Sequence, residues 1–215
     1  MRDLLPVWLP RAAIEALLIV FAVVLGFLVN EWRADRAAET RANLALTRIV
    51  GEMRDNLEAL ETAAEYHAQI VENLTAIEAE VQSGELPSSA NLFETVMPAM
   101  PMGISPPILS DVAWEYAGQT GALDQLDFEI MSEVARLYSV QELGTETTWK
   151  MIIDAFFFNE ESFEIREISA KLSFMRLSFT ELVSQERSLI FTYRSVIAQV
   201  EALVGIEPAA EDVGE

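Results

Sequence analysis

The chain has 215 residues, and its 35 Asp and Glu residues outnumber its 14 Lys and Arg residues to give a formal net charge of −21. Proteins bind nucleic acid through clustered Lys and Arg, so this charge argues against a nucleic-acid partner. The absence of cysteine excludes disulfides, thiolate catalysis and cysteine-bound zinc. The mean hydropathy of +0.22 is slightly high for a soluble protein, and one membrane-inserted segment would account for it.

The longest apolar run extends from Ala12 to Val29 and contains one charged residue, Glu15. As a helix this run spans roughly 27 Å, close to the thickness of about 30 Å of a bilayer's hydrocarbon core. A cleaved signal peptide is the alternative, but the run is long for one and no small-x-small cleavage site follows it cleanly. We therefore expect an interfacial segment at 1–11, which contains Trp8, and a transmembrane anchor at 12–30.

One face of the predicted anchor carries Glu15, Ala22, Gly26 and Asn30, spaced seven, four and four residues apart. Ala22 and Gly26 form a small-xxx-small pair, which lets two membrane helices approach closely. Glu15 can also pair with Arg11, four residues earlier, near the interface. In the alternative interpretation, Glu15 only extends to the headgroups and Gly26 is an ordinary membrane glycine. The spacing favours a membrane-helix interface on this face.

Two long amphipathic helices are predicted beyond the anchor. No Pro or Gly separates Asn30 from Gly51, so the anchor helix is expected to continue out of the membrane. Apolar residues then recur at alternating spacings of three and four from Leu46 to Val81, and again from Ile165 to Leu203. This alternation is typical of amphipathic or coiled-coil helices, and two seams of matching length are expected to pack antiparallel.

The predicted fold is therefore all-α: an N-terminal transmembrane helix continuous with a long helix, in an antiparallel helical bundle or coiled-coil hairpin with short inner helices. The helical extramembrane domain covers 31–204, with long helices at about 31–83 and 145–204 and shorter elements at 90–142. Ser110 and Thr145 are the expected caps of the helices that follow them. Gly84 is the expected stop of the first long helix, and 205–215 reads as a disordered acidic tail.

The anchor and its exit resemble an uncharacterised family of bacterial single-pass membrane proteins, in which an apolar helix with an early Glu ends in Asn-x-Trp and charged residues. The residues that match are Glu15, Asn30, Trp32, Arg33, Asp35 and Arg36, of which Asn30, Trp32, Arg33 and Arg36 form a membrane-exit motif. A second similarity covers Trp114, Gly121, Leu123 and Tyr138. The resemblance covers roughly two fifths of the chain and implies a helical domain behind a membrane anchor, without any known activity.

An apolar connector and a run of aromatic residues are the candidate partner surface: Met97, Met100, Met102, Phe156, Phe157 and Phe158. The methionine spacing is also that of thioether sets that hold Cu(I). Adaptable packing beside prolines is the more ordinary interpretation of these methionines.

Metal and catalytic sites find little support in the pattern. His67, the one histidine, lies on the first seam, and a di-metal carboxylate site would need Glu-x-x-His where position 64 is Ala. His67 is therefore interpreted as a packing or bundle-specifying polar residue. Glu160, Glu161, Glu164 and Glu167 could bind Mg²⁺ or Ca²⁺, but an acidic solvated face is commoner in a chain this negative. We expect no catalytic residue, no cofactor and no metal.

The sequence favours a non-enzymatic membrane protein that acts through protein–protein interaction or self-association, as a scaffold or accessory subunit. Its expected partners are the lipid bilayer and either a second copy or another membrane protein. An extracytoplasmic helical bundle that senses a ligand is the alternative. Lysine is rare relative to arginine and alanine is abundant, a bias typical of bacteria with a high GC content, so we expect a bacterial inner membrane. The positive charges on the two sides of the anchor are nearly balanced. We expect the C-terminal domain in the periplasm.

Overall fold

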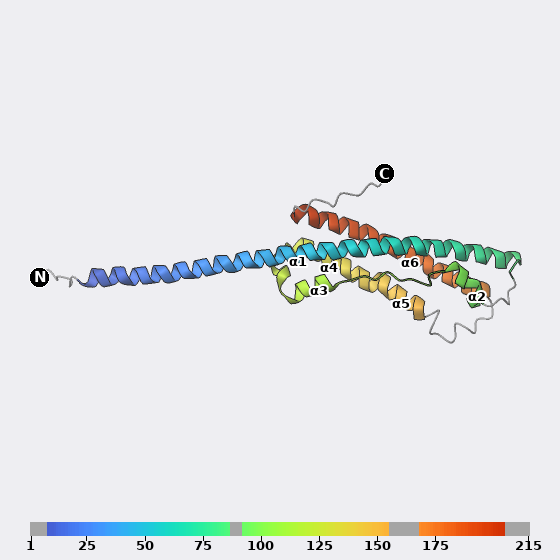
Figure 1. Cartoon of the computed structure of the whole chain (residues 1–215), viewed down its shortest axis with the longest axis horizontal. Helices are drawn as coiled ribbons and strands as arrows, with labels where there is room; N and C mark the ends of the chain where they lie inside the picture. The colour runs from blue at the N-terminus through green and yellow to red at the C-terminus, as the bar shows by residue number, and fades with distance from the viewer. Residues whose placement is uncertain (1–7, 87–91, 155–167, 205–215) are drawn as a thin grey trace.

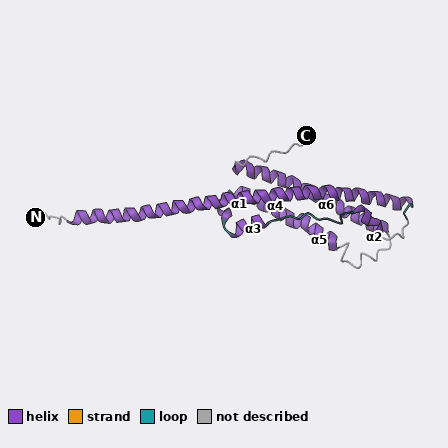
Figure 2. Cartoon of the chain, viewed as in Figure 1, coloured by secondary structure: helices purple, strands orange, loops and turns teal. Residues whose placement is uncertain are grey.

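The computed structural model of the chain describes residues 8–86, 92–154 and 168–204. Every regular element in these residues is a helix, joined by short loops (Figure 2). This confirms the all-α prediction. The predicted tail at 205–215 and the first seven residues of the predicted interfacial segment lie outside the described residues.

Helix α1 runs without interruption from Trp8 to Ser83, over 76 residues. Its first third extends alone, and its remainder packs on the other helices (Figure 1). The helix ends where Gly84 adopts a left-handed φ of 80°, which glycine tolerates without a Cβ clash. The amide of Leu86 then donates to the carbonyl of Glu80 over 3.1 Å, in the manner of a glycine C-cap. The predicted continuity of anchor and long helix is confirmed, and so is the stop at Gly84.

Helix α6, Ile168–Val204, packs antiparallel along the second half of α1 (Figure 1). Among the described residues, three arginine–glutamate pairs join the two helices: Arg54–Glu201 at 2.6 Å, Glu61–Arg194 at 2.7 Å and Glu78–Arg176 at 2.7 Å. Residue numbers rise along α1 as they fall along α6, which confirms the predicted antiparallel hairpin. The hydrogen bonds that Ser173 and Arg176 donate to Glu78 hold the pKa of its carboxyl group below the usual value.

The short helices lie against this hairpin. They are α2 (Leu92–Val96), η1 (Met97–Ala99), α3 (Val112–Gln119), η2 (Ala122–Gln125), α4 (Phe128–Val140), the π-turn η3 (Gln141–Glu146) and α5 (Thr147–Ile153). Helix α3 packs near the point where α1 leaves the bundle, and α2 lies at the opposite end (Figure 1).

The predicted single helix at 145–204 is wrong. The rings of Trp149 and Phe179 lie 6.4 Å apart, whereas one straight helix would separate them by roughly 45 Å. Thr145 is buried inside the π-turn η3 and does not cap a helix. The Gly144–Thr145 pair resembles a stop followed by a start, but the extra residue of a π-turn carries the chain from α4 into α5 without a break.

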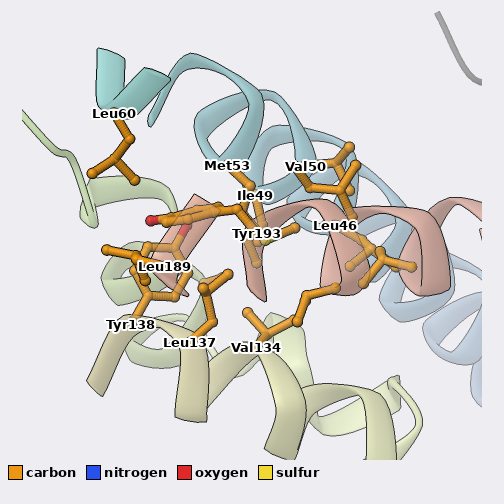
Figure 3. Close-up of a cluster of buried hydrophobic side chains, with 14 residues drawn as sticks. Leu46, Ile49, Val50, Met53, Leu60, Val134, Leu137, Tyr138, Leu189 and Tyr193 are labelled. Atoms are coloured by element: carbon orange, nitrogen blue, oxygen red, sulfur yellow. The ribbon is translucent and has the colours of Figure 1, made fainter. Parts of the chain in front are cut away.

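The core is built from α1, α4 and α6. Figure 3 shows side chains of α1 above, those of α4 below and those of α6 between them. The predicted seam residues Leu46, Met53, Leu60 and Leu74 are all buried, and burial of each stabilises the fold by about 1.5–3 kcal/mol. A second buried cluster at the far end of the hairpin is centred on Ile70, Leu74, Trp149, Leu172 and Phe179.

A polar pair interrupts the apolar seam. His67 on α1 and Glu186 on α6 have fully buried side chains, and Nδ1 of His67 lies 2.8 Å and 3.0 Å from the two carboxylate oxygens. Nε2 lies 3.0 Å from the carbonyl oxygen of Ile104, which can only accept, so Nε2 carries a proton. The pair sits where Trp149 and Phe179 pack on the imidazole ring. His67 thus occupies the packing position that the sequence predicted, with a specific partner.

We expect His67→Leu to lower the free energy of unfolding by about 3–5 kcal/mol, because it leaves Glu186 buried without a partner. The double variant His67→Leu/Glu186→Leu removes both polar groups and is expected to recover most of this loss. Chemical unfolding of the chain in detergent micelles, followed by circular dichroism, measures both. Equal destabilisation in the single and double variants would show that the two residues do not act as a pair.

Candidate functional site

The exposed part of α1 contains the one segment, among the described residues, that is long and apolar enough to cross a membrane. Its mean hydropathy is 2.2, and none of its most apolar window is buried by the rest of the chain. Leu17 and Phe27 are each 70% exposed, although side chains of this kind are normally buried. An apolar helix left this bare needs a lipid or protein environment.

The four residues predicted to form a membrane-helix interface lie along one side of this segment. Glu15, Ala22, Gly26 and Asn30 are all exposed, and the unbroken helix fixes their common direction. A Cβ built on Gly26 would meet nothing within 4 Å, so this side of the helix is open to a neighbour. Their role in association stays a prediction.

In the membrane-exit motif, a charged side chain lies close to an aromatic ring. The guanidinium of Arg36 lies 5.8 Å from the centre of the Trp32 ring, a cation–π distance, and also pairs with Glu39 at 3.9 Å. Arg33 is exposed beside them. An aromatic ring with an adjacent cation suits the boundary between lipid and water.

The structure divides the predicted partner surface of methionines and phenylalanines. Met97 and Met102 are 41% and 67% exposed, but Met100 is buried in the core cluster, so its assignment to a surface is wrong. Phe156, Phe157 and Phe158 lie outside the described residues, as does the glutamate cluster at 160–167. Within the described part of the chain, no group of His, Asp and Glu residues is arranged to hold a metal.

A surface groove lies between α1 and α3, a few turns beyond the exit motif, and no sequence pattern indicated it. We call it the α1–α3 groove; its volume is about 920 Å³. The residues that line it are Arg41, Leu44, Ala45, Arg48, Glu52, Val112, Ala113, Tyr116, Ala117, Thr120 and Ala122. Leu44, Val112 and Tyr116 are each more than half exposed there.

Glu52, which lines the groove, links α3 to α1 through hydrogen bonds. Its carboxylate accepts from the amides of Ala113 at 2.8 Å and Trp114 at 3.4 Å, at the N-terminus of α3. It also accepts from the hydroxyls of Ser110 at 2.7 Å and Tyr138 at 2.8 Å. A carboxylate at this end of a helix satisfies free amides and opposes the positive end of the helix dipole. Burial and the bond to Glu52 raise the pKa of Tyr138.

The predicted cap at Ser110 is therefore only partly right. The Ser110 hydroxyl oxygen lies 3.4 Å from the amide of Val112, while most of the capping comes from Glu52, 58 residues earlier in the chain. No local pattern could identify a cap from so far away.

Asn56 adds a buried polar link one turn after Glu52. Its side-chain amide donates to the carbonyl of Ser110 at 2.6 Å and to the hydroxyl of Tyr193 at 3.1 Å, and its oxygen accepts from the amide of Ser110 at 2.8 Å. Tyr193 in turn donates to Gln141 in the π-turn. Burial raises the pKa of Tyr193. The one sequence feature that could have indicated this polar link is Asn56 itself, a polar residue three positions after Met53 on the apolar stripe.

A scan against protein-family models and searches of curated proteins and of solved structures found no match for the chain.

We expect Glu52→Gln to lower the free energy of unfolding by about 1.5–3 kcal/mol, because four hydrogen bonds lose a charged acceptor. Chemical unfolding, followed by circular dichroism, measures this loss. Glu58→Gln, on the exposed side of α1, is the matched control and should leave the free energy of unfolding unchanged.

Proposed function

We propose that the chain is a membrane-anchored, non-enzymatic helical protein that acts through protein–protein interaction or self-association, as a scaffold or accessory subunit. The observation that carries this proposal is the single helix α1. It joins an exposed apolar segment to a helical bundle with a core of buried apolar side chains. A rigid helix holds the bundle at a fixed height and orientation above a bilayer. Function then resides in the surfaces that the bundle presents.

The ligand-sensing alternative requires polar groups that converge on a cavity inside the bundle. In the described core the polar groups that meet between helices bond to one another, while Nε1 of Trp149 is buried without a hydrogen-bond partner. His67 bonds to Glu186, and Asn56 bonds to Ser110 and Tyr193. These contacts favour a role for the bundle surface over a role for its interior.

The first test concerns the face that contains Gly26. We expect Gly26→Ile to weaken association in a bilayer by roughly 1 kcal/mol, about fivefold, since bulk on this face prevents close approach of a second helix. The space around Gly26 in the chain itself is empty, so the substitution leaves the fold intact. Energy transfer between labelled copies in vesicles measures self-association, and crosslinking in membranes measures association with other proteins.

Val24→Ile is the matched control, because residue 24 lies on the opposite side of the helix. An unchanged association in Gly26→Ile, or an equal loss in both variants, would contradict the role of this face.

The second test concerns topology. We propose a single-pass protein of a bacterial inner membrane whose C-terminal domain lies in the periplasm. An alkaline phosphatase fused after Val204 should then be active, and a cytoplasmic reporter fused at the same residue should be inactive. Activity of the cytoplasmic reporter would reverse the orientation. Loss of the chain from the membrane fraction after alkaline extraction would contradict the anchor itself.

A further inference from the structure

Two arginines give the α1–α3 groove a local charge opposite to that of the whole chain. Arg41 and Arg48 lie on one side of α1, seven residues or about 10 Å apart. Within the described residues neither guanidinium lies within ion-pair distance of a carboxylate; Nε of Arg41 donates to the carbonyl of Ala37 at 3.2 Å. Both charges therefore remain available to a partner.

The groove's own carboxylate makes no ion pair with these arginines, and the lining keeps a formal net charge of +1. Glu52 is the one acidic residue that lines the groove, and its oxygens are taken up by Ser110, Tyr138 and the N-terminus of α3. The result is a positively charged rim on a chain whose formal net charge is −21. Opposite charge on a partner would steer it to this site and set its register.

The surface between the two arginines is apolar. Leu44 is 54% exposed on α1, and Val112 and Tyr116 on α3 are 68% and 62% exposed. An apolar groove flanked by charges is the typical receptor for an amphipathic helix, which lays its apolar side into the groove and pairs its charged residues with the rim.

The groove lies on the same side of α1 as the open face of the apolar segment. Leu44 follows Gly26 by 18 residues, and 18 residues make about five turns of an α-helix. Because α1 is unbroken, Leu44 points in nearly the same direction as Gly26, about 27 Å further along the axis. A helix that contacts Gly26 and continues alongside α1 would reach the groove.

We propose that the α1–α3 groove binds an acidic amphipathic helix of a second membrane protein, one that leaves the bilayer beside α1. This deepens the proposed function and rests on it, since it names the chemistry of the partner. The partner helix presents aliphatic side chains to Leu44, Val112 and Tyr116. Its carboxylates, spaced by about two turns, pair with Arg41 and Arg48.

A second copy of the chain fits this groove poorly. In a two-fold dimer of parallel α1 helices each residue faces its own counterpart at the same height. Arg41 would then face Arg41 and Arg48 would face Arg48, so like charges would repel across the interface. A partner that carries carboxylates at these heights replaces the repulsion with attraction.

The groove also lies too far from the hydrocarbon core for lipid headgroups to contact it. Arg41 lies 12 residues after Val29, the last residue of the apolar run, which places it about 18 Å beyond the hydrocarbon along a helix normal to the bilayer. The headgroup layer is only about 5–8 Å thick on each side. Anionic headgroups would meet Arg33 and Arg36 first.

The test uses the full chain in bilayer discs of zwitterionic phosphatidylcholine and a fluorescent model peptide. The peptide has about 20 residues, long enough to form a helix, with Leu and Glu on one face and Ala and Gln elsewhere. A second peptide replaces each Glu with Lys. Fluorescence anisotropy should show that the acidic peptide binds, with an affinity that falls as salt is added, and that the basic peptide does not.

Arg48→Glu should weaken binding of the acidic peptide at least about tenfold, and Arg41→Glu should do the same. Arg187→Glu is the matched control: Arg187 is also an exposed arginine of a long helix, but it lies on α6, and this variant should bind within about twofold of the parent chain. Circular dichroism melting of all three variants checks that the bundle is intact. An equal effect of Arg48→Glu and Arg187→Glu, or equal binding of both peptides, overturns the proposal.

The two rival occupants have their own outcomes. Because the chain has no cysteine, Leu44→Cys introduces a single thiol. Efficient disulfide formation between two copies at residue 44 in the bilayer assigns the groove to a second copy and overturns the proposal. Loss of peptide binding on addition of the soluble headgroup glycerophosphoglycerol, compared with a salt of equal ionic strength, assigns it to lipid and does the same. If the acidic peptide fails to bind while Gly26→Ile still weakens association, the groove proposal fails and the proposed function stands.

Discussion

The continuity of α1 is the constraint on which the rest of the molecule depends. Gly26 and Gly51 lie inside α1, but the helix passes through both without a break, so it carries the direction of each side chain from one end to the other. This one helix contains the exposed apolar segment, the Trp32–Arg36 contact, one wall of the groove and the buried stripe of the core. The orientation of the bundle relative to the apolar segment is consequently fixed by helix geometry and does not depend on a linker.

Polar contacts across the hairpin determine how the other helices attach to α1. Apolar seams alone permit sliding by a heptad, because Leu and Met side chains pack against many partners with similar energy. The buried pair His67–Glu186 and the pair Arg54–Glu201 are satisfied in one register only, so a shift would leave buried polar groups without partners. Glu52 and Asn56 do the same for α3 and the loop before it. The groove lies beside α3, which a carboxylate at its N-terminus holds against α1 and whose Ala117 is buried in the core, while Val112 and Tyr116 stay exposed.

The charged residues are distributed unevenly over the molecule. Arg33, Arg36, Arg41 and Arg48 follow the part of α1 that begins where the apolar segment ends, and Glu31, Asp35 and Glu39 lie among them. Residues 30–48 therefore carry a formal net charge of +1, against −21 for the whole chain. A molecule that repels most acidic surfaces keeps one region that attracts them.

The sequence by itself determined the all-α class, the first long helix and its seam, because helix periodicity, a long apolar run and the stop at Gly84 are local properties of the chain. Leu46, Met53, Leu60 and His67 were predicted on one stripe and all are buried. Only the tertiary structure decided which polar residues meet. Glu186 is the partner of His67 across 119 positions, Glu52 caps a helix that begins 60 residues later, and the π-turn joins α4 to α5 where a break was expected. Such pairings depend on distances between helices that no local pattern encodes, and the α1–α3 groove, which arises from one of them, could be found only in three dimensions.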